Sequence, residues 1–197
     1  MKLSRRLQAV ADFIEDGSSV FDIGADHGNL EIFLSTSRKI NKIFAVDNKE
    51  GPYAILRNNT KDFANIKTKL SSGLDDYSSE YNTIVIAGMG GQLIVELLKQ
   101  HPESFSSIEH LIIDPHKNID ETRVELAKLG FKIKEEKIVK EKKKYYFVIH
   151  LIKGTDINYT EDEILYGVNV NNAELRNEYI ELDKQRKQRI KNRIEGK

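Results

Sequence analysis

The sequence Asp22-Ile-Gly-Ala-Asp-His-Gly28 decides the fold class of this 197-residue chain. It follows a strand-like run that ends in Val20-Phe21, and it precedes a helix-like run that begins near Leu30. A glycine turn between a strand and a helix is typical of nucleotide-type cofactor sites in α/β folds. The sequence therefore predicts a ligand site at this turn, and an ordinary tight connection between a strand and a helix is the alternative.

The turn departs from the dinucleotide fingerprint G-x-G-x-x-G. Starting at Gly24, that pattern needs glycine at two positions that are Asp26 and Asn29 in this chain. A carboxylate there would repel a pyrophosphate, which binds bare backbone N–H groups at a helix N-terminus. S-adenosylmethionine has no phosphate and carries a sulfonium cation, so acidic residues beside it are acceptable. We therefore expect this methyl donor rather than NAD, with Asp22 or Asp26 facing its methionine ammonium group.

Two further segments are expected to contact the adenosine part of the donor. Asp47 ends the second strand-like run, 23 residues after Gly24. An acid at that position can accept hydrogen bonds from both ribose hydroxyls, and the alternative is an N-cap for the helix that begins near Pro52. Ser72-Gly73-Leu74 follows the third strand and is expected to lie over the adenine ring, although a plain loop fits it equally well.

The loops after the fourth and fifth strands are expected to form the acceptor side of the site. Ile86-Ala-Gly-Met-Gly-Gly91 has three glycines in four residues, which lets the backbone come close to a ligand. Ligands bind at the carboxyl ends of the strands in such folds, so this loop would hold the methyl acceptor, and a flexible turn is the alternative. Asp114 of Asp114-Pro115-His116 would orient an acceptor amine, unless Pro115 serves to end the strand.

Apolar runs that alternate with helical patterns predict a mostly parallel α/β sheet. Strands are expected at residues 20–23, 43–46, 66–70, 83–87, 111–113, 131–139 and 145–152. The last two are separated only by Lys140–Lys144, which predicts a hairpin and an antiparallel strand. This pattern is typical of a class I (Rossmann-like) methyltransferase with a doubly wound, seven-stranded sheet.

The chain is expected to consist of a methyltransferase domain over residues 1–153 and a C-terminal helical appendage over 154–197. The appendage would comprise a linker and a charged helix from about residue 173 to 195. Apolar residues at heptad spacing, beginning at Leu175, continue for only about two turns. We therefore expect a monomer, and a dimer through this helix is the alternative.

Composition and charge limit the other classes of function. Hydrophobic residues make up 39% of the chain and charged residues 31%, as in soluble globular proteins. No apolar run is long enough for a membrane span, and no signal peptide is evident. With no cysteine and no metal-ligand spacing among five histidines, we expect a cytoplasmic protein without a metal site or a membrane partner.

The net charge is zero, but the positive charges are clustered. Residues 132–144 contain seven lysines, and residues 184–197 contain seven lysines and arginines against the single acid Glu195. Such patches permit contacts with nucleic-acid phosphates, which position an RNA without specifying its sequence. Solvated charged faces are the alternative.

These features together resemble the TrmK family, bacterial tRNA methyltransferases that act on N1 of adenine 22. The matching segments, over roughly residues 2–153, are Lys2–Leu7, Asp22–His27, Gly51-Pro52 and Ile86–Gly91. The resemblance implies an S-adenosylmethionine-dependent methyltransferase with tRNA as its partner. By this resemblance the donor and acceptor pockets would be lined by Gly24, Asp26, His27, Asp47, Asn48 and Gly88 to Gly91.

The chain departs from the family pattern at three places. Gly28-Asn-Leu-Glu31 stands where the family has an aromatic-and-proline stretch, and Asp114-Pro115-His116 stands where it has a Gln-Pro-Asn-like triplet. The C-terminal appendage is also shorter. The departure at residues 114–116 bears on amide-based recognition of adenine, and the shorter appendage bears on tRNA docking through residues 173–197.

The acceptor chemistry suggests roles for individual residues. N1 of adenine has an in-plane lone pair, so no general base is needed, and Asp26 or Asp114 would stabilise the cationic product ring. The base must be extruded into the pocket, where Tyr53 and Met89 would stack on it. The expected catalytic residues are Asp26, Asp114 and Met89, and the expected cofactor-binding residues are Asp22, Gly24, Asp26, His27, Asp47, Asn48, Ser72, Gly73, Gly88 and Gly90.

Three other functions fit part of the sequence. A class I methyltransferase could act on another RNA, a protein or a small molecule. A non-catalytic RNA-binding protein would have a degenerate donor pocket, although the intact glycine loops disfavour it. A nicotinamide-dependent dehydrogenase would have to bind NAD despite Asp26.

Overall fold

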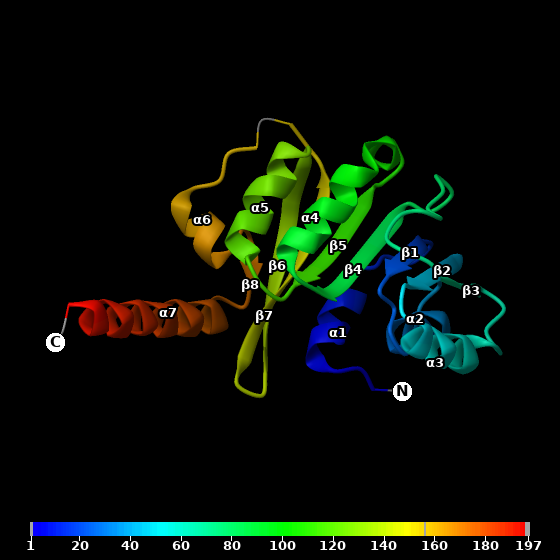
Figure 1. The fold of residues 1–197 in the computed structure, drawn as a ribbon, viewed down its shortest axis with the longest axis horizontal. Helices are drawn as coiled ribbons and strands as arrows, with labels where there is room; N and C mark the ends of the chain where they lie inside the picture. The colour runs from blue at the N-terminus through cyan, green and yellow to red at the C-terminus, as the bar shows by residue number, and fades with distance from the viewer. Residues whose placement is uncertain (1, 156, 196–197) are drawn as a thin grey trace.

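The computed structural model describes residues 2–155 and 157–195 and contains an eight-stranded sheet with helices on both faces (Figure 1). Its strands are β1 (Ser19–Ile23), β2 (Lys42–Asp47), β3 (Ile66–Leu70), β4 (Thr83–Met89), β5 (His110–Pro115), β6 (Phe131–Glu141), β7 (Lys144–Lys153) and β8 (Val170–Asn171). Its helices are α1 (Arg5–Ala11), α2 (Asn29–Ser37), α3 (Glu50–Thr60), α4 (Gly91–Gln100), the 3-10 helix η1 (Pro102–Ser106), α5 (Ile119–Lys128), α6 (Glu161–Tyr166) and α7 (Ala173–Ile194).

The strand order is β3-β2-β1-β4-β5-β7-β6-β8. β1 to β5 run parallel, and β7 lies antiparallel between β5 and β6. The order reverses between β1 and β4, which creates the crevice where such sheets bind ligands. The expected class I methyltransferase fold and its terminal hairpin are therefore confirmed, with one correction: the short strand β8 pairs with β6 and makes the sheet eight-stranded rather than seven-stranded.

Two apolar cores, one on each face, hold the sheet between its helices. On one face, Ile94 of α4 and Leu126 of α5 pack against residues of β1, β4 and β5. On the other face, Val10 of α1, Leu34 of α2 and Leu56 of α3 form the second core. The central strands are buried on both sides, which explains why they appear in the sequence as nearly continuous apolar runs.

The spacing of apolar residues predicts an amphipathic helix over residues 4–15 with Ser4 as its cap, and α1 is shorter than that. Ser4 caps it as predicted, by accepting a hydrogen bond from the Leu7 N–H (3.3 Å). The helix ends at Ala11 rather than near residue 15, because Phe13 and Ile14 leave the helical path to fill the core under β1. The N-terminal turn of α1 lies near the carboxyl edge of the sheet, where Arg6 pairs with Asp114 near the end of β5.

The segment expected to be a linker is attached to the sheet by a buried ion pair. The Arg123 guanidinium on α5 donates to both carboxylate oxygens of Glu136 on β6, at 2.9 and 2.7 Å. Arg123 also donates to the Ile164 carbonyl of α6 (2.7 Å), and Glu136 accepts the Val168 N–H (2.9 Å). Both side chains are essentially inaccessible to solvent. Through these contacts the buried pair joins the appendage to the domain. The domain boundary expected at residue 154 stays a prediction.

The last helix, α7, projects away from the body of the molecule (Figure 1). At its start, Leu175 and Tyr179 pack against the core of the domain. Farther along, Leu182, Ile190 and Ile194 are 45%, 50% and 80% exposed. Two of the expected heptad positions therefore face the chain's own domain rather than a partner helix.

Of the helices described in residues 2–155 and 157–195, none combines the length and apolarity that crossing a membrane requires. The same residues contain no cluster of three or more His, Asp or Glu side chains able to hold a metal ion.

Candidate functional site

The turn between β1 and α2 has an unusual backbone. Gly24, Asp26 and Gly28 have φ values of 79°, 53° and 80°, a region that glycine enters without strain. A Cβ atom on Gly24 would lie 2.6 Å from Met89 Cε. The turn therefore packs directly against Met89 at the end of β4, and the positive φ favours glycine at position 24.

Asp47 fixes the position of this turn. Its Oδ2 accepts the Asp26 N–H (3.2 Å) and its Oδ1 accepts the Lys49 N–H (2.9 Å). The Gly24 N–H donates to the Val46 carbonyl at 2.8 Å. The N-cap of α3 is Lys49 and none of the described side chains caps this helix, so the alternative role of Asp47 as a helix N-cap is wrong. Its contact with the ribose of a donor stays a prediction.

A cleft of about 240 Å³ opens at the carboxyl ends of β1 and β4. Its walls come from α1, the β1–α2 turn, the start of α2, the end of β4 and the residue after β5. The expected site residues that line it are Asp22, Gly24, Asp26, His27 and Gly88. The structure thus brings together residues from the first and fourth strands at the edge where ligands bind in this fold.

The other expected donor residues lie outside this cleft, along the same edge of the sheet. The Ser71 N–H donates to the Asp47 carbonyl (2.9 Å), which brings the loop of Ser72 and Gly73 beside the end of β2. A Cβ on Gly73 would lie 2.7 Å from Leu97 of α4. The exposed Asn48 follows Asp47, and Gly90 is the N-cap of α4. Their contacts with a donor stay predictions.

Asp114 is completely buried and lies behind two other side chains. Its Oδ2 forms an ion pair with Arg6 Nη1 and lies 3.3 Å from His116 Nε2. Its Oδ1 has no hydrogen-bond partner among the described residues. Arg6 and His116 line the cleft and Asp114 does not. These two side chains therefore separate Asp114 from the cleft, and any role of Asp114 toward an acceptor stays a prediction.

The aromatic ring of Tyr146 lies beside Arg6 and His116. The Arg6 guanidinium carbon lies 5.8 Å from the ring centroid of Tyr146, and the His116 ring lies 5.3 Å from it. A guanidinium near an aromatic face is held by a cation–π interaction. Arg6, His116 and Tyr146 therefore form a polar and aromatic wall with Asp114 behind it.

Sequence reasoning assigned no role to Arg6, His116 or Tyr146. The helix that contains Arg6 is predicted from its apolar residues, and that pattern assigns no role to a polar residue such as Arg6. Arg6 is also 108 residues away from Asp114 in the sequence. No local spacing links these residues. The match of residues 2–7 to the family pattern was the one available signal.

The cleft is acidic, and its acids are partly buried. Burial is the main cause that raises the pKa of Asp22 to about 6, and the nearby Asp47 carboxylate adds to it. Burial and the neighbouring Asp22 hold the pKa of Glu31 well above its usual range. The Asp26 carboxylate lies 2.7 Å from His27 Nδ1. Such a lining suits a ligand with a cationic group and is unfavourable for a pyrophosphate, so it fits the methyl donor.

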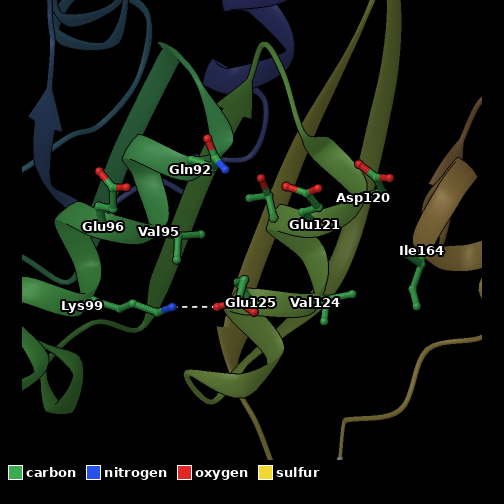
Figure 2. Close-up of a pocket in the computed structure, with 10 residues that line it drawn as sticks. Gln92, Val95, Glu96, Lys99, Asp120, Glu121, Val124, Glu125 and Ile164 are labelled. Atoms are coloured by element: carbon green, nitrogen blue, oxygen red, sulfur yellow. Dashed lines mark hydrogen bonds and ion pairs between the residues drawn. The ribbon is translucent and has the colours of Figure 1, made fainter.

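A larger groove is lined by α4 and α5, with Ile164 of α6 as a further lining residue (Figure 2). It measures about 470 Å³ and is crossed by an ion pair between Lys99 and Glu125 (2.6 Å). Helix surfaces form its walls, and none of the expected site residues lines it. The cleft at the strand ends is therefore the candidate functional site.

Comparison with known proteins identifies the domain family of this chain. The methyltransferase-domain family matches residues 3–149. The curated tRNA (adenine(22)-N(1))-methyltransferase of Bacillus subtilis is 31% identical over 153 residues, which cover 76% of this chain and 64% of that enzyme. The chain therefore spans less than two thirds of the length of this relative.

Two solved structures resemble the chain over most of its length. M. capricolum TrmK, in complex with S-adenosyl-homocysteine, is 28% identical with a TM-score of 0.84, over 96% of this chain and 87% of that one. The Streptococcus pneumoniae protein Sp1610, in complex with S-adenosyl-L-methionine, is 30% identical with a TM-score of 0.80, over 84% and 79% of the two chains.

Proposed function

We propose that this chain, which belongs to the TrmK family of class I methyltransferases, transfers a methyl group from S-adenosylmethionine to N1 of adenine 22 in tRNA. The observation that carries the proposal is the acidic cleft at the β1–α2 turn. It suits a cationic methyl donor, and it lies in a fold shared with relatives that are named for this reaction or solved with this donor.

The donor would be held along the carboxyl edge of the sheet. Asp22 and Asp26 line the cleft and would face the methionine ammonium group, while Asp47 would accept hydrogen bonds from the ribose hydroxyls. Asp47 is already the acceptor of two backbone N–H groups, but each carboxylate oxygen retains further lone-pair capacity. The loop of Ser72 and Gly73 would cover the adenine ring.

In this proposal, catalysis depends on positioning the adenine base against the methyl group of the donor. The donor supplies an electrophilic methyl group, and N1 of adenine attacks with its own lone pair. The protein therefore has to align the base and exclude water rather than remove a proton. Arg6, His116 and Tyr146 would form the wall against which the extruded base is placed. Met89, whose Cε lies beside Gly24, would be a second contact of the base.

In this proposal, the lysine-rich tip of the β6–β7 hairpin would contact the tRNA backbone. The pairing of Ile113 with Ile149 shows that the tip extends past the carboxyl end of β5, at the same edge as the cleft. The Arg6 N–H donates to Glu141 Oε2 (3.3 Å), so the hairpin contacts a helix that lines the cleft. Among the described residues, Lys142, Lys143 and Lys144 form no ion pair, which leaves their charges available for phosphates.

The decisive test of the proposed function is a mapped methylation assay. The protein is incubated with labelled S-adenosylmethionine and unmodified tRNA, and the product is read by reverse transcription. We expect label incorporation and a stop at one adenine, because a methyl group on the Watson–Crick face blocks pairing. Label without a stop would refute methylation of N1, and an absence of donor binding would refute the enzyme assignment.

Replacing the three hairpin lysines by alanine should weaken tRNA binding roughly ten-fold at moderate salt and flatten its salt dependence, since each lost phosphate contact lowers the slope. The variant is Lys142→Ala, Lys143→Ala and Lys144→Ala. Affinity for S-adenosylhomocysteine should not change. The matched control replaces Lys39, Lys61 and Lys67, which are exposed and lie toward the opposite edge of the sheet. Equal loss of tRNA affinity in both variants would contradict a specific role for the hairpin.

A further inference from the structure

Glu31 is a buried carboxyl group for which the proposed mechanism has no use. It lies in the first turn of α2, and its side chain is completely inaccessible to solvent. Neither of its carboxylate oxygens has a hydrogen-bond partner among the described residues. Burying an unpaired carboxylate is costly, so this group needs a physical explanation.

The neighbour of Glu31 is another carboxyl group, that of Asp22, which is 4% exposed. The two groups lie within hydrogen-bonding reach of each other. Two carboxylates have no hydrogen to share, so a hydrogen bond between them requires a proton on one of them. That proton supplies the partner that the oxygens of Glu31 lack.

The surroundings favour retention of this proton. The charged groups that act on the pair are acidic: Asp26 of the turn acts on Glu31, and Asp47 of β2 acts on Asp22. Arg6 of α1 lines the same cleft but is paired with Asp114. No cation in the part of the chain that the structure describes is paired with Asp22 or Glu31, and little solvent reaches them. Ionising both carboxyl groups at the same time would therefore be strongly unfavourable.

The two members of the pair differ in their access to the cleft. Asp22 lines it and Glu31 does not. We propose that Glu31 is a positioning residue that holds a proton against Asp22, so that the pair presents one negative charge to the ammonium group of the methyl donor. This inference rests on the proposed function, because it assumes a ligand with an amino acid moiety in this cleft.

The proposal predicts the direction in which the affinity for the donor changes with pH. Burial raises the pKa of Asp22 to about 6, so below that pH the pair takes up a second proton and becomes neutral. Affinity for the ammonium group should then fall as the pH falls through about 6. The two groups titrate as a coupled pair, so the midpoint belongs to both.

Calorimetry with two ligands separates the role of Glu31 from the rest of the site. S-adenosylhomocysteine carries the amino acid moiety, and 5′-methylthioadenosine is the same adenosine without it. The proteins are wild type, Glu31→Gln, which keeps a neutral donor, and Glu31→Leu, which removes it. Binding is measured at several pH values between about 5 and 8.

We expect Glu31→Gln to bind S-adenosylhomocysteine within about two-fold of wild type and Glu31→Leu to bind it roughly ten-fold more weakly at neutral pH. In Glu31→Leu the loss of affinity on acidification should also begin at higher pH, because a buried Asp22 without a donor is neutralised more easily. Affinity for 5′-methylthioadenosine should be the same in all three proteins.

Two results would overturn the inference. One is wild-type affinity and pH dependence for S-adenosylhomocysteine in Glu31→Leu. The other is an equal loss for both ligands, which would indicate a merely structural role. Failure of the wild-type protein to bind either ligand would instead refute the donor assignment itself.

Stability provides a second readout that does not require a ligand. The pKa of Glu31 is raised above 4.5 in the folded protein, so the stabilisation from its retained proton is present at acidic pH and is lost as the pH rises. Glu31→Gln keeps its donor at every pH. Its melting temperature should therefore exceed that of wild type by an amount that grows above about pH 4.5, and a constant difference would contradict a buried proton on Glu31.

Discussion

The variant Arg6→Ala should lower kcat/KM for tRNA methylation by about 100-fold while it changes the affinity for S-adenosylhomocysteine little. A loss of this size is typical when a reacting group is misplaced by about 1 Å. Arg6 forms an ion pair with the buried Asp114 and lies beside the Tyr146 ring. Without it, the acceptor wall loses its central cation and Asp114 is left as a buried anion. Steady-state kinetics with tRNA and calorimetry with the donor product measure the two quantities separately.

Two variants control this expectation. Arg5→Ala removes the adjacent arginine, which donates only a long hydrogen bond (3.4 Å) to the Lys140 carbonyl, and its activity should stay within a few-fold of wild type. Asp114→Asn removes the counter-charge of Arg6 and should also impair methylation. Because the two residues form one pair, the double variant should lose less than the sum of the single effects. Normal kcat/KM in both single variants would show that the pair has no part in acceptor placement.

The variant Arg123→Leu should lower the free energy of unfolding by about 3–5 kcal/mol, the usual effect of removing one partner from a buried ion pair. It leaves the Glu136 carboxylate uncompensated in the core and removes the donor to the Ile164 carbonyl. Urea denaturation gives the free energy of unfolding. Limited proteolysis should show earlier cleavage between β7 and α7, because this pair attaches the intervening segment to the sheet.

A surface pair and a double variant test this explanation. Lys184→Ala breaks an exposed pair with Glu181 and should leave stability unchanged, since such pairs contribute little. Replacing Arg123 by methionine and Glu136 by leucine together should recover much of the loss, because no buried charge is then left unpaired. A double variant less stable than Arg123→Leu would contradict the account.

Much of the fold was predictable because it depends on the spacing of apolar residues that are close together in the sequence. Short apolar runs separated by helical patterns gave the seven main strands and their order along the chain. The run Lys140–Lys144, too short for a helix, gave the terminal hairpin. The short β8 was not predictable, because two residues carry no periodic pattern. Its pairing with β6 depends on tertiary contacts, such as the hydrogen bonds from Val168 to Glu136 and from Asn171 to Glu135.

The candidate site was predictable on its donor side and not on its acceptor side. The donor side is a contiguous turn, Asp22–Gly28, so composition alone indicated a cationic ligand. The acceptor wall joins Arg6, Asp114 and Tyr146 from three distant segments. A carboxylate at position 114 could be proposed from the sequence, but its burial behind Arg6 could not.

The sequence by itself therefore determined which elements form, where the glycine turn lies and which kind of ligand that turn suits, because these depend on neighbours along the chain. Only the tertiary structure decided which charges face one another. It placed Asp22 beside Glu31 in a buried contact, Arg6 over Asp114 and Arg123 on Glu136. The physical reason is that burial sets the energy of a charge and the state of its proton, and burial is a property of the packed fold rather than of any local segment.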